Sequence, residues 1–227
     1  MAEILVIGAH PDDAEIGMGG TILALQRAGH RVAILDLTDG EPTPRGTPEL
    51  RRRESREAAA VLGVERVTLD LPNRYLQDTI EARRRVAEVI RLRRPELVFA
   101  PYWQDAHPDH VAASAIADAA RFYAKLTKTD LAGEPFYPRR VYYYFCTHLR
   151  LLVAPSFVYA FTEEELERKV QAVERYRSQF AERPDGLRIG EAIRIAARWW
   201  GAQVRRPCGE PFLSREPLGL EGLEGVI

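Results

Sequence analysis

Short apolar runs and helix-forming stretches alternate along the first two thirds of the chain, and this alternation constrains the fold more than any other feature. The apolar runs are typical of buried parallel strands, and Gly29 and Gly63 are helix stop signals. We predict strands at 3–7, 31–37, 67–71, 96–100 and 141–146, and helices at 20–28, 47–62, 79–93 and 110–123. This succession predicts a three-layer, Rossmann-like α/β fold with a doubly wound, mostly parallel central sheet.

The last third of the chain carries weaker signals. We predict a strand at 156–161, a long helix at 163–180 that begins with a capping box, and a further helix at 189–200. The segment from Arg205 onward is rich in proline and glycine and is predicted to be a loop. A length of 227 residues suits one domain, so we expect residues 1–150 to form a core on which residues 151–227 pack.

The charge balance argues against one class of function. The chain has 32 basic and 33 acidic residues, so its formal net charge of −1 does not favour binding of nucleic acid by bulk charge. No apolar run approaches the roughly 20 residues that span a bilayer. The two cysteines, Cys146 and Cys208, are expected to be buried thiols rather than ligands. We therefore expect a cytoplasmic protein with neither a membrane nor a nucleic-acid partner.

Two motifs rich in histidine and aspartate follow predicted strands. Residues 10–15 (HPDDAE) come after the first strand, and residues 107–110 (HPDH) come after the fourth. Ligands of such sheets bind at the carboxyl ends of the strands, so we expect the two motifs to converge on one cleft. Two histidines and one carboxylate can hold a divalent ion and leave room for water. The sequence therefore predicts a metal site, for which zinc and ferrous iron are both suitable.

A nucleotide-binding turn is the alternative for the first motif. A dinucleotide site needs G-x-G-x-x-G directly after the strand, so that the backbone can approach the pyrophosphate. Here Gly8 is followed by residues 9–13 (AHPDD), which place negative charge where a phosphate would lie. The glycines at 17, 19 and 20 come too late and are better explained as a closely packed entry to a helix.

Both motifs, in this order and with residues 17–21 (GMGGT) after the first, resemble the zinc-dependent N-acetylglucosaminyl deacetylases of the LmbE/PIG-L family. The helix pattern Arg51-x-x-Glu54 also matches, and the resemblance spans most of the first 125 residues. Residues 155–157 (PSF) and 178–180 (SQF) look like the branch that deacetylates N-acetylglucosaminyl malate in bacillithiol biosynthesis. The resemblance implies a zinc-dependent amide hydrolase, a small acetylated amino-sugar substrate and a homohexamer.

The resemblance also implies roles for individual residues. Matching positions give zinc ligation to His10, Asp13 and His110, general-base catalysis to Asp12, oxyanion support to His107, orientation of that ring to Asp109, and substrate binding to Arg51. On physical grounds, a protonated His107 would stabilise the tetrahedral oxyanion together with the metal. Adjacent carboxylates diverge, so Asp13 can bind the metal while Asp12 takes a proton from the attacking water.

Several questions stay open in the sequence. Ala106 stands where we expect many members of the malate branch to carry a basic residue, so Arg45 or Lys125 would have to meet the malate carboxylates. His148 fits the edge of the cleft and a surface loop equally well. Diacetylchitobiose, or another small N-acetylated sugar, is the alternative substrate. A non-catalytic metal- or nucleotide-binding regulatory module is the alternative from another class, and the second carboxylate of the Asp12–Asp13 pair argues against it.

Overall fold

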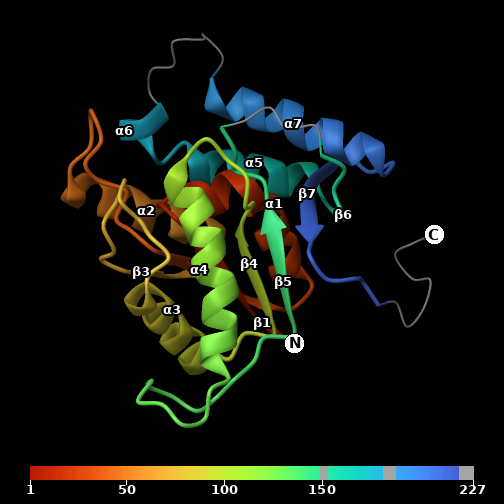
Figure 1. Cartoon of the computed structure of the whole chain (residues 1–227). Helices are drawn as coiled ribbons and strands as arrows, with labels where there is room; N and C mark the ends of the chain where they lie inside the picture. The colour runs from red at the N-terminus through yellow and green to blue at the C-terminus, as the bar shows by residue number, and fades with distance from the viewer. Residues whose placement is uncertain (149–152, 181–187, 220–227) are drawn as a thin grey trace.

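A seven-stranded sheet runs through the centre of the molecule (Figure 1). The computed structural model describes residues 1–148, 153–180 and 188–219. Along the sheet the strand order is β3-β2-β1-β4-β5-β7-β6. The bounds are β1 Glu3–Gly8, β2 Arg31–Asp36, β3 Glu65–Thr68, β4 Leu97–Pro101, β5 Arg140–Tyr144, β6 Phe157–Phe161 and β7 Cys208–Ser214. The first five strands in this order pair in parallel, whereas β7 is antiparallel to both β5 and β6.

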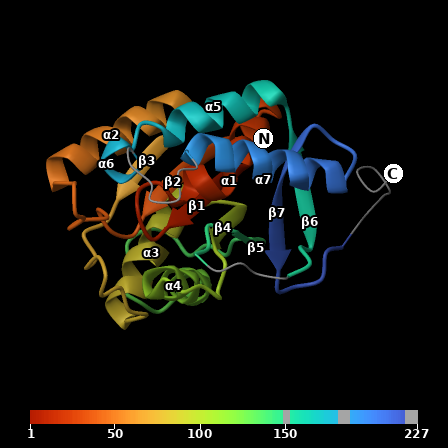
Figure 2. The same cartoon turned by 90° about the horizontal axis from the view of Figure 1, so that it is seen from above.

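Helices cover both faces of this sheet, as predicted. Seen from above, α3 and α4 lie on one side, and α1, α2 and α5 lie on the other (Figure 2). The helices are α1 Asp13–Arg27, α2 Pro48–Leu62, α3 Ile80–Arg93, α4 Pro108–Ala124, α5 Glu163–Val173, α6 Arg177–Phe180 and α7 Ile189–Gln203. The three-layer α/β architecture and its mostly parallel sheet are therefore confirmed. No helix within the described residues is long and apolar enough to cross a membrane.

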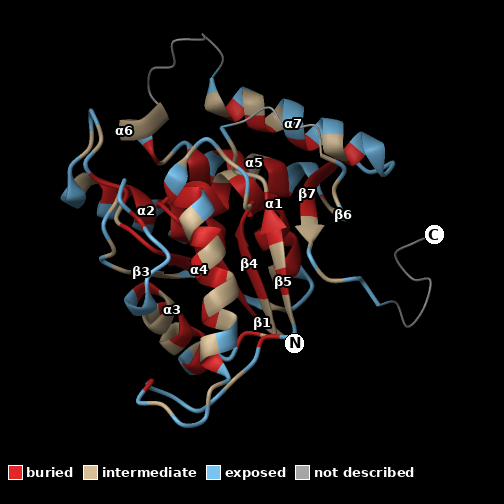
Figure 3. Cartoon of the chain, viewed as in Figure 1, coloured by how far each residue is buried: buried red, intermediate tan, exposed pale blue. Residues whose placement is uncertain are grey.

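Strand β1 shows why the central strands are continuously apolar. Leu5 and Ile7 belong to the core on the α3–α4 side, while Ile4 and Val6 belong to the core on the α1–α2 side. All four residues are at most 1% exposed. In Figure 3 the colour of buried residues dominates the central strands. A strand covered by helices on both faces has no polar side, which explains the unbroken apolar run in the sequence.

Helix α1 begins at Asp13, seven residues before the predicted start at Gly20. The glycines lie inside the helix, which kinks at Met18, whose φ of −149° is not helical. At Gly17 a Cβ would lie only 2.2 Å from a ring carbon of Tyr144, so a side chain could not fit there. The local sequence looked unfavourable for a helix because glycine is a weak helix former. Close packing against β5 is the reason that glycine is needed.

The C-terminal third departs most from prediction. The segment predicted as a loop from Arg205 contains β7, in which Cys208 and Phe212 are fully buried. The long helix predicted at 163–180 is broken after Val173 and resumes as the short helix α6. Tyr176, in the break, is buried and donates a hydrogen bond to Glu15 at 2.8 Å. This long-range contact turns the chain, and no local periodicity could have indicated it.

Smaller differences concern the ends of elements. Strand β3 occupies Glu65–Thr68 rather than 67–71, and α4 begins at Pro108 rather than at residue 110. His107 is the N-cap of α4, and its ring accepts a hydrogen bond from the Asp109 N–H. The capping box of α5 is present as predicted, with Thr162 and Glu165 bonded reciprocally. The shift in α4 matters most, because it places the second motif on the first turn of a helix.

Candidate active site

The two motifs meet at the carboxyl end of the sheet, as the sequence predicted. Strands β1 and β4 are parallel neighbours, with Val6 opposite Phe99, so the segments that follow them lie side by side. The ring centroids of His10 and His107 are 4.7 Å apart, and those of His10 and His110 are 5.3 Å apart. Residues separated by about a hundred positions thus form one histidine cluster.

Asp13 is held at the centre of this cluster by the backbone. The N–H groups of Ala9 and His10 both donate to its Oδ2, each at 2.9 Å. Its other oxygen, Oδ1, lies 3.2 Å from Nε2 of His110. Burial alone would raise the pKa of Asp13, but the charge of His110 and the hydrogen bond to His10 hold it well below its ordinary value. Asp13 is therefore a fixed, ionised carboxylate with one oxygen directed toward the histidines.

His110 lies between two carboxylates. Nε2 faces Asp13, and Nδ1 is 2.5 Å from Oδ2 of Asp105. Burial would lower the pKa of His110, but the charge of Asp13 and the hydrogen bond to Asp105 outweigh it and raise this pKa to about 10. A carboxylate on the far nitrogen is the usual partner of a metal-binding histidine, because it fixes the orientation of the ring.

Sequence reasoning missed Asp105. Its side chain is fully buried and anchors the neighbouring loop, because its Oδ1 also accepts the His148 N–H at 2.8 Å. The available signal was an acidic residue in the same strand-end loop as the second motif. That signal is weak, because aspartate is common in loops for other reasons.

His10 and Asp109 form the third side of the cluster. Nε2 of His10 lies 3.1 Å from Oδ2 of Asp109, whose oxygens also accept the N–H groups of Arg74 at 2.7 Å and Leu76 at 3.2 Å. Burial would lower the pKa of His10, but the hydrogen bonds to Asp109 and Asp13 raise it to about 9. The Asp109 carboxylate is thus directed at His10, whereas the sequence led us to expect it to orient His107.

His107 is in a different electrostatic state. Burial, together with the charges of His10 and His110, lowers its pKa to about 4, so the ring is neutral near pH 7. Its Nδ1 accepts the N–H of Asp109 at 3.2 Å, which leaves the proton of the neutral ring on Nε2. The protonated His107 expected from the sequence is therefore not favoured in this structure; the ring is a neutral Nε2–H donor.

The Asp12 carboxylate points away from that of Asp13 and toward Arg51. Nη2 of Arg51 donates to Asp12 at 3.0 Å and also to the carbonyl of Pro11. Asp12 has a φ of +122°, a conformation that side chains rarely adopt and that marks functional sites when surrounding contacts enforce it. Burial raises the pKa of Asp12 to about 6, although Arg51 acts in the opposite direction.

Arg51 is almost entirely buried within the site. It is only 3% exposed, and its guanidinium lies over the ring of Tyr176, 5.2 Å from the centroid. Its Nε and Nη1 are buried without a hydrogen-bond partner in the described part of the chain. Leaving buried donors unpaired is costly, so Arg51 holds its place beside Asp12 at the expense of two unsatisfied nitrogens.

A cavity of about 320 Å³ opens above these residues. The predicted residues His10, Asp12, Asp13, Arg51, His107 and His110 line it; Asp109 does not. Its other lining residues are Ile16, Gly40, Pro42, Thr43, Asn73, Arg74, Cys146, His148, Gln179 and Phe180. His148, whose place the sequence left open, is thus a cavity residue. The volume is in the range of sites for small molecules.

Cys146 is closer to the cluster than we expected. Its Sγ lies 3.6 Å from Oδ1 of Asp13, and burial raises its pKa well above the ordinary value. It is accordingly a neutral, half-buried thiol beside the predicted ligands, whereas Cys208 is buried as predicted.

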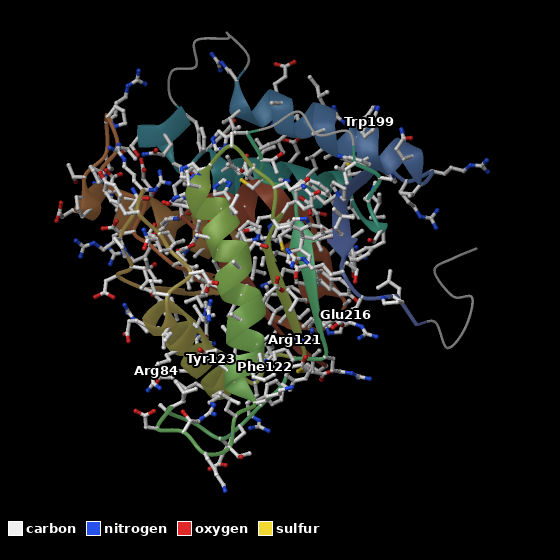
Figure 4. All side chains as sticks on the ribbon, in the orientation of Figure 1. Arg84, Arg121, Phe122, Tyr123, Trp199 and Glu216 are labelled. Atoms are coloured by element: carbon white, nitrogen blue, oxygen red, sulfur yellow. The ribbon has the colours of Figure 1, made fainter. Side chains whose placement is uncertain are left out.

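Lys125 is remote from the cavity. It follows the C-terminal end of α4, and its Nζ lies over the rings of Phe122 and Tyr137. Figure 4 shows Arg121, Phe122 and Tyr123 at this end of the helix, opposite the end that carries the second motif. The suggestion that Lys125 meets a substrate carboxylate is therefore wrong. Arg45 is not among the described residues that line the cavity either.

The cluster suits a divalent cation. The ligand atoms of His10, Asp13 and His110 all lie within 4.8 Å of one another, and all three residues are buried. Two further groups overlap with this one: His10, His107 and Asp109, and then Asp105, His110 and His148. The pKa values of His10 and His110 are raised because carboxylates surround both rings and stabilise positive charge there. A divalent ion can supply that positive charge in place of protons.

Comparison with known proteins adds independent information. Residues 5–121 match the family described as PIG-L, GlcNAc-PI de-N-acetylase. The diacetylchitobiose deacetylase of Thermococcus kodakarensis is 35% identical over 199 residues, which are 79% of this chain and 71% of that protein. A probable N-acetyl-alpha-D-glucosaminyl L-malate deacetylase of Bacillus anthracis is 28% identical over 198 residues, 78% and 81% of the two chains. The solved structure of the conserved protein TT1542 from Thermus thermophilus has 40% identity and a TM-score of 0.87, covering 97% of each chain.

Proposed function

Because the chain belongs to the PIG-L family of GlcNAc-PI de-N-acetylases, we propose that it is a metal-dependent deacetylase whose substrate is N-acetylglucosaminyl malate. The observation that carries the reaction class is the pairing of Asp12 and Asp13 with His10, His107 and His110 in one cavity. The sequence features at 155–157 and 178–180, together with the relative from Bacillus anthracis, favour the malate conjugate.

In this proposal His10, Asp13 and His110 hold the metal ion. Zinc fits two imidazoles and one carboxylate, and ferrous iron is the alternative with the same ligands. When bound, the ion supplies Lewis acidity to the acetyl carbonyl and to water. Asp105 orients His110 through Nδ1, and Asp109 orients His10 through Nε2. The two ligand histidines thus each have a carboxylate that positions the ring.

Asp12 is the proposed general base. Its pKa of about 6 is close enough to neutrality for it to accept a proton and to release it again. Arg51 holds the carboxylate in place through a hydrogen bond of 3.0 Å. Asp12 would take a proton from the water that attacks the acetyl carbon, and then pass it to the departing amine. The products are acetate and the free amino sugar.

His107 is the proposed donor to the oxyanion. A neutral ring protonated at Nε2 can donate one hydrogen bond into the cavity, and such a preorganised donor stabilises the tetrahedral intermediate. Asp109 contributes through its backbone N–H, which holds Nδ1 as the acceptor. This differs from the role that the resemblance implied, because the carboxylate of Asp109 is engaged by His10.

Diacetylchitobiose is the second candidate substrate. The observation in its favour is the 35% identity to the Thermococcus kodakarensis deacetylase, which exceeds the 28% identity to the malate deacetylase. The same catalytic residues would serve both substrates, because both contain an N-acetylglucosamine amide.

The test is release of free amine by zinc-loaded protein from N-acetylglucosaminyl malate, diacetylchitobiose and N-acetylglucosamine in parallel. Protein stripped by a chelator is the control, and zinc should restore its activity. Preference for the malate conjugate supports the proposal, whereas preference for diacetylchitobiose replaces the substrate and keeps the reaction. Metal binding without any amine release would favour a non-catalytic metal-binding module.

A further inference from the structure

Arg74 has a backbone conformation that is unusual for a residue with a side chain. Its φ is +68°, in the left-handed region where glycine is favoured. The conformation directs the Arg74 N–H at Oδ2 of Asp109, at 2.7 Å, and the Leu76 N–H at Oδ1, at 3.2 Å. The backbone of this loop thus holds Asp109, and glycine at position 74 would serve that purpose with less strain. The arginine side chain must have another use.

That side chain lines the cavity and has no partner in the described part of the chain. Among the described residues, no carboxylate or other acceptor pairs with the Arg74 guanidinium, whereas nearby arginines do have partners. Arg83 pairs with Asp78 at 2.6 Å, and Arg84 pairs with Asp130 at 2.8 Å. The other arginine of the cavity, Arg51, is buried and bonded to Asp12. Arg74 is exposed at the edge of the cavity and is available to a ligand.

The charges around Arg74 favour an anionic ligand. The acidic residues that line the cavity, Asp12 and Asp13, are both bonded within the catalytic cluster. His148 lines the same cavity, and its side chain is 61% exposed. A guanidinium has only donors and pairs best with a planar carboxylate through two parallel hydrogen bonds. Hydroxyl groups of a neutral sugar would not use that geometry.

We infer that Arg74 is a specificity-determining residue that binds a carboxylate on the group attached to the N-acetylglucosamine. This inference deepens the proposed function and rests on it. It also gives Arg74 the role of meeting the malate carboxylates. The sequence left that role open, because Ala106 stands where a basic residue is expected. The substrate class is therefore an amino-sugar conjugate with an anionic aglycone, which separates it from neutral disaccharides.

The test compares Arg74→Gly with the wild type on N-acetylglucosaminyl malate and on diacetylchitobiose. Glycine retains the N–H to Asp109 and suits the positive φ, so the fold and the catalytic cluster are preserved. The ratio of kcat/KM for the malate conjugate to that for diacetylchitobiose should fall about 10- to 100-fold, mainly through KM, as expected for a lost charge-assisted hydrogen bond. Arg74→Lys keeps the positive charge but not the two parallel N–H donors of the guanidinium. It should therefore recover part of the kcat/KM ratio between the two substrates.

Tyr75→Ala is the matched control, because Tyr75 is 75% exposed in the same loop and does not line the cavity. It should leave the ratio unchanged. Higher salt should lower the wild-type ratio and have less effect in Arg74→Gly, because salt screens exposed charges. An unchanged ratio in Arg74→Gly, or equal losses on both substrates, would overturn the inference; equal losses would mean that position 74 acts only through Asp109.

A binding measurement separates this inference from the proposed function. If wild-type protein released amine from neither substrate, the proposed function would fail. Calorimetric titration with glucosaminyl malate and with glucosamine would still test Arg74. Tighter binding of the malate conjugate by wild type, lost in Arg74→Gly, supports the inference; equal binding by the two proteins contradicts it.

Discussion

Two buried charged clusters lie along helix α1, and they differ in how completely they are satisfied. Near its middle, Glu210 from β7 accepts the N–H groups of Gly20 and Thr21, the Thr21 hydroxyl and Nζ of Lys169. At its N-terminal end, the candidate active site combines three histidines and several carboxylates with a cavity. The first cluster has a partner for each charge, whereas the second leaves two nitrogens of Arg51 without one among the described residues.

The difference shows that buried charges that stabilise the fold and buried charges of the candidate active site occupy different parts of helix α1. Glu210 caps the part of α1 that follows the kink at Met18, and so replaces the backbone partners that the kink removes. The hydrogen bonds of Glu210 thus hold this part of the helix in place. The active-site cluster borders a cavity, and several of its groups have strongly shifted pKa values, which is typical of a site that binds a ligand.

The largest effects are expected from removing metal ligands. His10→Ala and His110→Ala should each lose bound metal together with turnover, because each removes one of three buried protein ligands. Metal content per chain, measured by mass spectrometry alongside amine release, checks this. His30→Ala is the control, since that ring accepts the Ala2 N–H at 3.2 Å and does not line the cavity of the candidate active site. Normal metal content in both ligand variants would reject the assignment.

Asp12→Asn should separate base catalysis from metal binding. Turnover should fall by about 10²- to 10⁴-fold, the usual contribution of general acid–base catalysis, while metal content stays normal. The amide retains an acceptor for Arg51, so the variant should fold. Single-turnover measurements with saturating substrate check the prediction. Full activity would exclude Asp12 as the base, and loss of metal would move it into the ligand set.

Glu210→Gln should damage the fold rather than the chemistry. The Lys169–Glu210 pair is buried, and removing one charge of such a pair costs about 3–5 kcal/mol of unfolding free energy. Denaturant unfolding measures this loss, and KM should be unaffected in the folded fraction. Adding Lys169→Met should recover much of the lost stability, because no unpaired charge then stays buried. A stable single variant would show that the pair is not structural.

Asp105→Asn should give the smallest effect of the series. Removing the carboxylate behind His110 should weaken metal affinity by about 10- to 100-fold, the usual cost of losing such a partner. Competition with a chromogenic chelator measures the affinity. Turnover with saturating metal should then exceed that of His110→Ala. Unchanged affinity would mean that Asp105 serves only to anchor the loop at His148.

The motifs made the centre of the site predictable. Apolar runs buried on both faces can only be central strands, and the ends of neighbouring parallel strands must meet. The convergence of His10 and His110 followed from that topology. Partners outside the motifs could not be deduced, because Asp105 and Arg74 have no distinguishing local pattern. Even the orientation of Asp109 depended on the Arg74 loop, which lies more than thirty positions earlier in the chain.

The sequence by itself determined the fold class and the convergence of the two histidine–aspartate motifs, because apolar runs and the positions of the motifs after them are local properties. Only the tertiary structure decided which groups are partners. It made strand β7 from a segment that looked like a loop, since the backbone of β5 on one side and of β6 on the other pairs with it. It also kept His107 neutral and placed Arg74 at the cavity. Burial and long-range hydrogen bonds set these properties, and neither is recorded in the order of residues.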